Sequence, residues 1–138
     1  MNKRLKAVVV AGLAVALLTT AATVATARTT YTTSKPVLSG PPHKDKTFTA
    51  SGVITPKSTA KSRATVKIIL WMKYGADDWG VMDTFWAKLS ARPAGKPGTR
   101  YARAITIPMK GDHGVQAVQY RNGKQVSKSR TVYFTVQP

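Results

Sequence analysis

Residues 65–89, TVKIILWMKYGADDWGVMDTFWAKL, decide the fold expected for this chain. Every second residue from Val66 to Tyr74 is apolar or aromatic, which is the period of a strand that has one face in a core. The run Gly75-Ala76-Asp77-Asp78 follows, and its Gly and Asp residues favour a tight turn. The stretch therefore predicts an antiparallel hairpin with a four-residue loop.

The register of this hairpin assigns its side chains to two faces. A four-residue loop sets Tyr74 opposite Trp79 and Lys67 opposite Trp86. The side chains that then point toward the core are those of Val66, Ile68, Leu70, Met72, Tyr74, Trp79, Val81, Phe85, Ala87 and Leu89. Asp83 would also point inward, opposite Leu70, so we expect a β-bulge beside it.

Outward from this hairpin, short β-rich runs recur between Gly, Pro, Asn and Asp residues, and no helical period appears after residue 27. Strands are predicted near residues 46–54, 65–74, 79–89, 101–107, 114–121 and 129–136, with Val37-Leu38 as a first edge strand. Asn122-Gly123 predicts a type I′ hairpin turn, because both residues tolerate positive φ. About seven short antiparallel strands predict an all-β, immunoglobulin-like two-sheet sandwich.

Residues 1–27 are predicted to be a signal peptide. Three basic side chains precede the apolar run Ala7–Leu18, and Ala25-Thr26-Ala27 ends the segment. The apolar run is shorter than the roughly 20 residues that span a bilayer, so we expect cleavage before Arg28 and no transmembrane segment after processing. Residues 28–45, rich in Thr and Pro, are predicted to be a flexible spacer with an edge strand, and residues 46–138 the sandwich domain.

A set of short motifs runs through residues 46–137 in a fixed order. The set consists of Phe48–Pro56 (FTASGVITP), Val66-Lys67-Ile68, Trp79, Ala87-Lys88, Tyr101-Ala102-Arg103, Ile107–Gly111 (IPMKG), Val115-Gln116-Ala117, Ser127-Lys128-Ser129 and Tyr133–Val136 (YFTV). In order and spacing it resembles the immunoglobulin-like repeats of secreted and surface proteins of actinobacteria and related bacteria. Such repeats usually carry an aromatic residue where this chain has His113, and often Tyr-Arg where it has Met72-Lys73. The resemblance implies a spacer, adhesion or accessory binding module without catalytic residues.

The charge of the chain is strongly positive. Three of its 22 Lys and Arg residues lie in residues 1–27, so 19 remain against five Asp and no Glu, a formal charge of +14. Such a balance favours polyanionic partners, among them wall polymers, anionic lipid surfaces and non-specifically bound nucleic acid. The chain has no cysteine, which excludes disulfides, thiol nucleophiles and thiolate metal sites.

In an immunoglobulin-like strand order, loops 55–64, 90–100 and 121–128 meet at one end of the sandwich. The candidate polyanion-binding residues on these loops are Lys57, Lys61, Arg63, Arg92, Lys96, Arg100, Arg121, Lys124 and Lys128. The loops carry no acidic residue, and Asp45, Asp77, Asp78 and Asp112 are expected at the opposite end. The alternative is that these charges are solvated and bind only counterions.

The outward positions of the strands predict a second surface. The candidate residues of an aromatic outer sheet face are Ile69, Trp71, Met82, Trp86, Val118, Tyr120 and Tyr133. An apolar patch of this size is typical of an interaction surface, which could dock a partner, pair two copies into a homodimer or stack sugar rings. A register slip of one residue, or cover by the N-terminal segment, would remove it.

The sequence offers little material for catalysis. Its two histidines, His43 in the Pro-rich lead-in and His113 in a predicted turn, are expected at the surface without a metal-ligand pattern. Asp77-Asp78 is explained by turn chemistry, and the absence of Glu leaves few carboxylates for hydrolysis. We therefore expect no enzyme activity, no cofactor and no metal.

Three functions remain. The first is a secreted binding or adhesion module for an anionic extracellular or cell-wall polymer, acting through the basic loops. The alternative is a protein-interaction or self-associating module that uses the aromatic face, and the third is a secreted cationic antimicrobial protein or inhibitor. Salt separates the first two, because polyanion binding weakens steeply with ionic strength and apolar docking does not.

Overall fold

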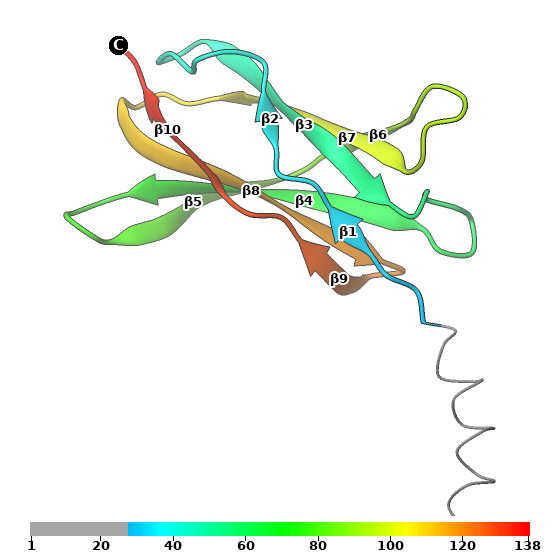
Figure 1. Cartoon of the computed structure of the whole chain (residues 1–138). Helices are drawn as coiled ribbons and strands as arrows, with labels where there is room; N and C mark the ends of the chain where they lie inside the picture. Colours follow the sequence, from blue (N-terminus) through cyan, green and yellow to red (C-terminus); the bar gives the residue numbers. More distant parts are fainter. Residues whose placement is uncertain (1–27) are drawn as a thin grey trace, which may run out of the picture. The chain divides into compact units, whose positions relative to one another are not determined.

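Ten strands make two antiparallel sheets that pack face to face in the computed structural model, which describes residues 28–138 (Figure 1). The first sheet has the order β1-β3-β7-β6, with β2 also paired to β3. Its strands are β1 (Thr32–Thr33), β2 (Val37–Leu38), β3 (Thr47–Thr55), β6 (Lys88–Ala91) and β7 (Thr99–Thr106). The predicted signal peptide, residues 1–27, lies outside the described residues.

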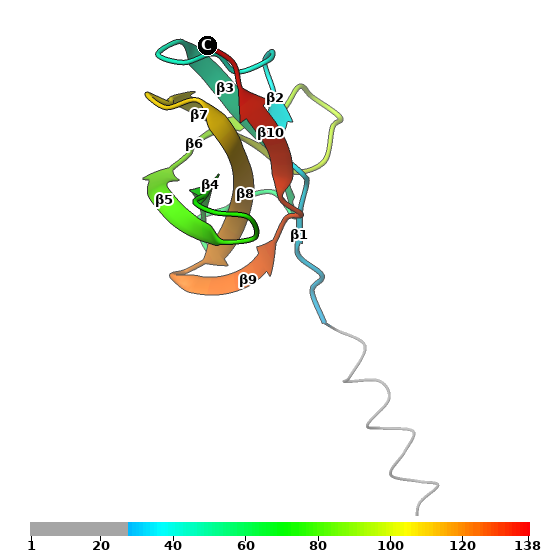
Figure 2. The same ribbon diagram turned by 90° about the vertical axis from the view of Figure 1, so that its left-hand side faces the viewer.

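The second sheet has the order β10-β8-β4-β5, with β9 also paired to β8. Its strands are β4 (Ala64–Lys73), β5 (Trp79–Trp86), β8 (Gly111–Arg121), β9 (Lys124–Lys128) and β10 (Val132–Val136). The chain changes sheets after β3, β5 and β7, as in immunoglobulin-type sandwiches. The prediction of an all-β, two-sheet antiparallel sandwich is therefore confirmed, and Figure 2 shows its two layers.

The core lies between the inner faces of the two sheets, because alternate residues of each strand point inward. Its buried apolar members are Phe48, Ala50, Ile54, Ala64, Val66, Ile68, Leu70, Tyr101, Ile105, Ile107, Val115, Ala117 and Val136. Phe85, Ala87 and Leu89, also expected inside, pack against this core. With no cysteine in the chain, packing and hydrogen bonds alone hold the two sheets together.

The strand predicted over residues 79–89 is two strands that belong to different sheets. β5 ends at Trp86, and β6 begins at Lys88 and pairs with β7 of the first sheet. Ala87 is the link, and its N–H still donates to the carbonyl of Val66, 2.8 Å away. The sequence pattern is continuous across this point because the apolar side of both strands faces the same core.

The β4–β5 hairpin differs from its prediction in two places, and the second difference reverses the change in register that the first one causes. Its loop is five residues long, so Trp79 pairs with Lys73 and the N–H of Tyr74 donates to the carbonyl of Asp78. A bulge in β5 then restores the expected register, and Leu70 pairs with Asp83 as predicted. The bulge expected beside Asp83 is thus present.

Between the loop and the bulge, every side chain of β5 takes the opposite face from the predicted one. Trp79 and Val81, expected inside, are exposed by 38% and 50%, and Tyr74 is a loop residue exposed by 62%. Met82, expected on the outer face, packs against the core. The cause is the period of a strand, in which a shift of one residue exchanges the two faces.

The Thr-rich segment predicted as a flexible spacer is partly built into the sandwich. Thr32 and Thr33 form β1 and pair with the end of β3, and Val37-Leu38 forms the predicted edge strand. The hydroxyl of Tyr101 donates to the carbonyl of Ser34, 2.8 Å away. Backbone and hydroxyl groups of this segment thus bond to strands of the sandwich, whereas those of a flexible spacer would bond to water.

Two local predictions have opposite outcomes. Asn122 and Gly123 have φ of 50° and 83°, as a type I′ turn requires, and they lead into β9. His113, predicted in a surface turn, is instead a fully buried residue of β8. Its ring stacks on Phe134, and its Nδ1 lies 2.9 Å from the carbonyl oxygen of Gly111.

Candidate functional site

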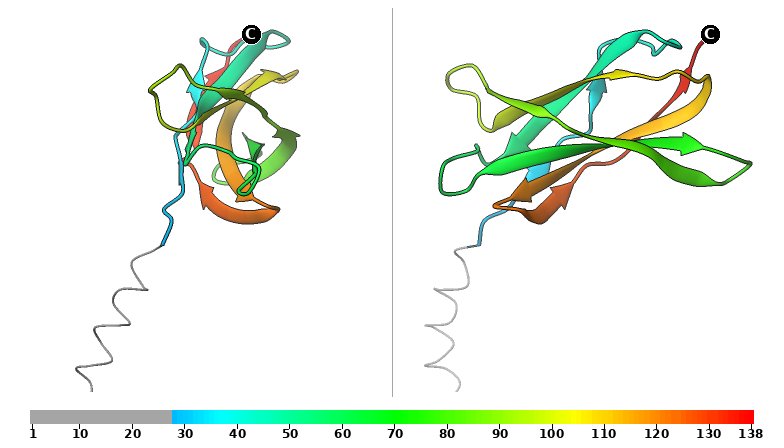
Figure 3. Two further views of the ribbon diagram at one scale, coloured as in Figure 1. Left: turned by 90° about the vertical axis from the view of Figure 1, so that its right-hand side faces the viewer. Right: turned by 180° about the vertical axis from the view of Figure 1, so that it is seen from behind.

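Three loops lie together at one end of the sandwich, as expected. They are residues 56–63 after β3, residues 92–98 after β6, and the turn between β8 and β9 (Figure 3). The Asn122 side chain joins two of them, since its Oδ1 accepts from the N–H of Arg63 and its Nδ2 donates to the carbonyl of Lys61. Ser58 joins the first loop to β7 through the hydroxyl of Thr99.

Seven of the predicted polyanion-binding residues gather at this end, which we call the basic loop end. They are Lys57, Lys61, Arg63, Arg92, Lys96, Arg100 and Lys124. All are exposed except Arg92, which is half-buried and donates to the carbonyl of Pro97. Lys128 is exposed but lies farther along β9, opposite Val118.

The acidic residues of the described chain lie elsewhere. Asp45 precedes β3, Asp77 and Asp78 are in the β4–β5 loop, and Asp112 is near the start of β8, all at the opposite end as predicted. Asp83 lies within β5. Over residues 28–138, therefore, no carboxylate side chain belongs to the basic loop end.

Arg121 is the exception among the predicted binding residues. Its side chain is only 4% exposed and points into the sandwich instead of toward solvent. The guanidinium donates to the carbonyls of Pro56, Lys57 and Ser62 and to Oε1 of Gln119. The prediction placed it with the surface cations because it counted residue 121 in the loop 121–128, although the alternation that puts Val115 and Ala117 inside continues to Arg121.

Burial and the neighbouring ring act on Arg121 in opposite directions. Burial lowers the pKa of the guanidinium below its ordinary value, and Tyr31 raises it. The guanidinium nevertheless stays a cation, since arginine does not lose its proton in proteins. A buried cation thus holds the backbone of loop 56–63, and the lysines of that loop extend from a fixed base.

The network around Arg121 continues to the N-terminal segment. Gln119 donates through Nε2 to the carbonyl of Thr32, 2.8 Å away, and to the hydroxyl of Thr33, 3.2 Å away. The Thr33 hydroxyl also lies 2.6 Å from that of Ser127. Buried polar groups therefore join β1, β8, β9 and loop 56–63 beneath the basic loop end.

The outer face of the second sheet carries the predicted aromatic surface with one exchange of members. Six of the seven predicted residues lie there by register, and Met82 does not. Trp79 and Val81 take its place. The aromatic face therefore consists of Ile69, Trp71, Trp79, Val81, Trp86, Val118, Tyr120 and Tyr133, and it holds all three tryptophans of the chain.

Two ring pairs stand on this face. Trp79 meets Tyr133 edge-to-face at 5.1 Å, and Trp86 meets Tyr120 in the same manner at 5.9 Å. The ammonium of Lys67 lies 5.2 Å from the Trp86 ring centre. Val118 is on this face by register yet only 4% exposed, and its cross-strand neighbours on both sides are the long side chains of Lys67 and Lys128.

The described residues contain no group of three or more His, Cys, Asp or Glu side chains that could hold a metal ion. Among the same residues no helix is long and apolar enough to cross a membrane. The charged and aromatic groups described above can provide hydrogen bonds, charge and ring contacts to a ligand.

Comparison with known proteins gives a resemblance in fold only. The sequence matches no protein-family model and no curated protein. Among solved structures, a superoxide reductase (neelaredoxin) from Ignicoccus hospitalis aligns over 76% of this chain and 82% of its own, with 11% identity and a TM-score of 0.47. This is a distant likeness between two antiparallel sandwiches and carries nothing about activity.

Proposed function

We propose that this chain is a secreted, non-catalytic immunoglobulin-like module that binds an anionic extracellular polymer through its basic loop end. The observation that carries the proposal is the gathering of seven cations on three adjacent loops and on the first residues of the strands that follow two of them, a region to which the described chain contributes no acid. Such a surface attracts polyanions over long range and gains free energy when the polymer releases its counterions.

The network beneath the loops supports the same proposal. Loop 56–63 carries Lys57, Lys61 and Arg63. The buried guanidinium of Arg121 donates hydrogen bonds to three backbone carbonyls of this loop. A loop that is already ordered loses less entropy when it binds than a mobile loop does. The charged side chains thus extend from an ordered backbone.

The location of the polymer follows from the N-terminal segment and from the resemblance to bacterial immunoglobulin-like repeats. A cleaved signal peptide puts the protein outside the cell, where a wall polymer is the abundant polyanion. Nucleic acid would bind the same charges without sequence preference, because base-specific reading needs groups that reach base edges.

The test is retention of the protein, purified after expression of the full chain, on isolated cell wall and on DNA-cellulose across about 50 to 500 mM NaCl. We expect retention at low salt and steep release as salt rises. A triple variant, Lys57→Gln, Lys61→Gln and Lys124→Gln, should lower the slope of log affinity against log salt by about one per lysine.

The matched control removes the same charge from the opposite end. Lys44, Lys46 and Lys110 are exposed there, so the triple Gln variant at these positions changes the net charge equally. It should leave the slope nearly unchanged. Equal weakening by both triples would show that only total charge matters, and absence of retention at the lowest salt would end the proposal.

A second candidate is docking of another protein, or of a second copy, on the aromatic face. Trp79, Trp86 and Tyr133 favour it, because 38%, 57% and 66% of these side chains are exposed. Binding or dimerisation of this kind would survive 500 mM salt and fail with Trp71→Ala or Trp86→Ala. Light scattering at low and high salt separates it from the polyanion proposal.

A further inference from the structure

The basic loop end and the aromatic face meet at one hollow of the surface. Its volume is about 360 Å³, at the lower end of the range of pockets that hold small ligands. The lining residues come from loop 56–63, the start of β4, the end of β5, the link and β6, and they are Ser58, Arg63, Ala64, Thr65, Trp86, Ala87 and Leu89.

This hollow combines three kinds of surface. Its floor is aliphatic, with Ala64 buried and Ala87 and Leu89 half-buried. Trp86 forms one side with an indole that is 57% exposed. Arg63 supplies an exposed guanidinium at the rim. A ligand that satisfies all three needs an apolar ring face and an anionic substituent.

The indole of Trp86 is held in place from outside the hollow. Tyr120 contacts it edge-to-face at 5.9 Å, and the Lys67 ammonium lies 5.2 Å from its ring centre. Neither residue lines the hollow. The ring is therefore supported by neighbours that leave it free to contact a ligand, and its orientation is already set before binding.

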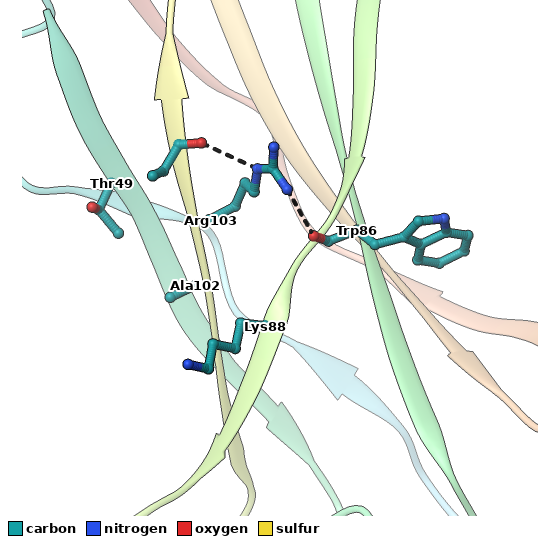
Figure 4. A pocket seen from close by; sticks show the side chains of 6 residues that line it. Thr49, Trp86, Lys88, Ala102 and Arg103 are labelled. Atoms are coloured by element: carbon teal, nitrogen blue, oxygen red, sulfur yellow. Dashed lines mark hydrogen bonds between the residues drawn. The ribbon is translucent and has the colours of Figure 1, made fainter.

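A second hollow, of about 340 Å³, is also lined by Trp86, but the guanidinium of Arg103 in it already has partners within the protein (Figure 4). Arg103 there donates to the carbonyls of Trp86 and Ala104, and its guanidinium lies 4.7 Å from the Phe85 ring centre. Figure 4 shows the Trp86 indole pointing away from Lys88 and Arg103. In contrast, within residues 28–138 the side chain of Arg63 donates to no protein acceptor, although its backbone is bonded to Asn122.

We propose that the hollow between Arg63 and Trp86 binds one sugar ring of an acidic polysaccharide. The C–H groups on one face of a pyranose are apolar and pack on the electron-rich indole, while Arg63 pairs with a carboxylate or phosphate on the same ring. Hydroxyls of the sugar meet those of Ser58 and Thr65. Ser58 Oγ accepts from the N–H of Ala64, so its own proton remains to be donated.

The assignment rests on the proposed function, since it names the polymer that the basic loop end attracts. A polymer of phosphate alone would use Arg63 and gain nothing from the indole. A neutral polysaccharide would use the indole and leave the guanidinium without a partner. A charged pyranose makes both contacts at once.

The test measures affinity for a tetrasaccharide of galacturonic acid by calorimetry at about 50 mM salt, where charge contacts are strong. Trp86→Ala should weaken binding about tenfold, in keeping with the loss of one ring-stacking contact. The same variant should bind linear polyphosphate of equal charge as the unaltered protein does. Arg63→Gln should weaken binding of both polymers. Trp79→Ala, which removes an exposed tryptophan near the far end of the same face, is the matched control and should change neither.

Each failure has a distinct signature. If no anionic polymer binds at low salt, the proposed function fails. If polyphosphate and tetragalacturonate both bind and Trp86→Ala affects neither, the sugar subsite fails while the proposed function stands. If Trp86→Ala weakens binding of oligothymidylate more than of tetragalacturonate, the indole stacks on bases and the sugar assignment is wrong. Trp86→Phe, which keeps an aromatic ring, should restore most of the affinity and shows that the fold is intact.

Discussion

At the basic loop end, hydrogen-bonded polar side chains fill the space between the two sheets, whereas at the opposite end packed rings fill it. The polar group consists of Arg121, Gln119 and the carbonyls to which they donate hydrogen bonds. In the second, Phe48 meets Phe134 edge-to-face at 5.7 Å and His113 stacks on Phe134. Hydrogen bonds require particular atoms at particular angles, while apolar packing requires mainly volume. The end that carries the candidate site therefore tolerates fewer substitutions of its interior residues than the opposite end.

The largest test of this contrast is Arg121→Met. The substitution removes the donor for three backbone carbonyls and for Oε1 of the buried Gln119, so we expect the free energy of unfolding to fall by about 3–5 kcal/mol. Urea denaturation measures it, with Arg63→Met as the control at the solvated side of the same end, where the change should stay within about 0.5 kcal/mol. Arg121→Lys should recover little, because an ammonium cannot span the same acceptors. A loss below about 1 kcal/mol for Arg121→Met would contradict the role given to this network.

The second test uses alkaline pH. Burial raises the pKa of Tyr101 to about 12 from an ordinary value of 10.0. The folded state therefore holds this proton more tightly than the unfolded state, and the stability that it contributes is complete below about pH 10 and is lost as pH rises from about 10 to about 12. The loss should be about 2–3 kcal/mol.

Tyr101→Phe isolates this contribution from the titration of lysines in the same range. The unaltered protein should be the more stable of the two at about pH 9, since its hydroxyl donates to the carbonyl of Ser34. The order should reverse near pH 12. Parallel stability curves for the two proteins from about pH 9 to 12 would show that Tyr101 does not titrate as described.

The smallest effect is expected where the end is apolar. Phe134→Leu exchanges one apolar side chain for another beside Phe48 and His113, and should cost about 1 kcal/mol by thermal or urea unfolding. Gln119→Leu keeps a side chain of similar size but removes the hydrogen bonds to Thr32 and Arg121. It should lower the free energy of unfolding by about twice as much as Phe134→Leu does. Equal costs for the two substitutions would remove the distinction between the two ends.

Much of the fold was predictable because alternation of apolar residues survives in most strands. The period in Val66–Leu70 and in Val115–Ala117 identifies core faces that the structure confirms. Asn122-Gly123 fixes its turn through backbone preference alone. These signals are local, so neighbouring residues in the sequence are enough to read them.

The faces of the β5 residues could not be predicted in the same way, because a loop residue and a bulge shift the strand register. The five-residue loop and the bulge in β5 exchange the faces of Trp79, Val81 and Met82 while leaving the ends of the hairpin in register. The predicted bulge alone does not produce this exchange, because with a four-residue loop Trp79 and Val81 would still point inward. The fifth loop residue exchanges the two faces, and the bulge then returns Phe85 to the core side.

The candidate site was predictable in location and not in detail. The loops and most of their cations come together as the strand order requires. Arg121 was assigned to the surface because residue 121 was counted in the loop 121–128, whereas alternation along β8 gives it an inward position, where its guanidinium has partners some 60 residues earlier in the chain. Long-range polar partners of this kind leave no local pattern.

The bulge in β5 also bears on how the protein behaves at high concentration. β5 is an edge strand of its sheet, and a long flat edge would offer unpaired backbone groups to the edge of another molecule. The bulge at Met82 interrupts that row of groups, and the neighbouring Asp83 adds a charge to it. In a sandwich without disulfides, with three tryptophans on one face, the bulge and the charge thereby keep this edge strand from acting as a template for aggregation.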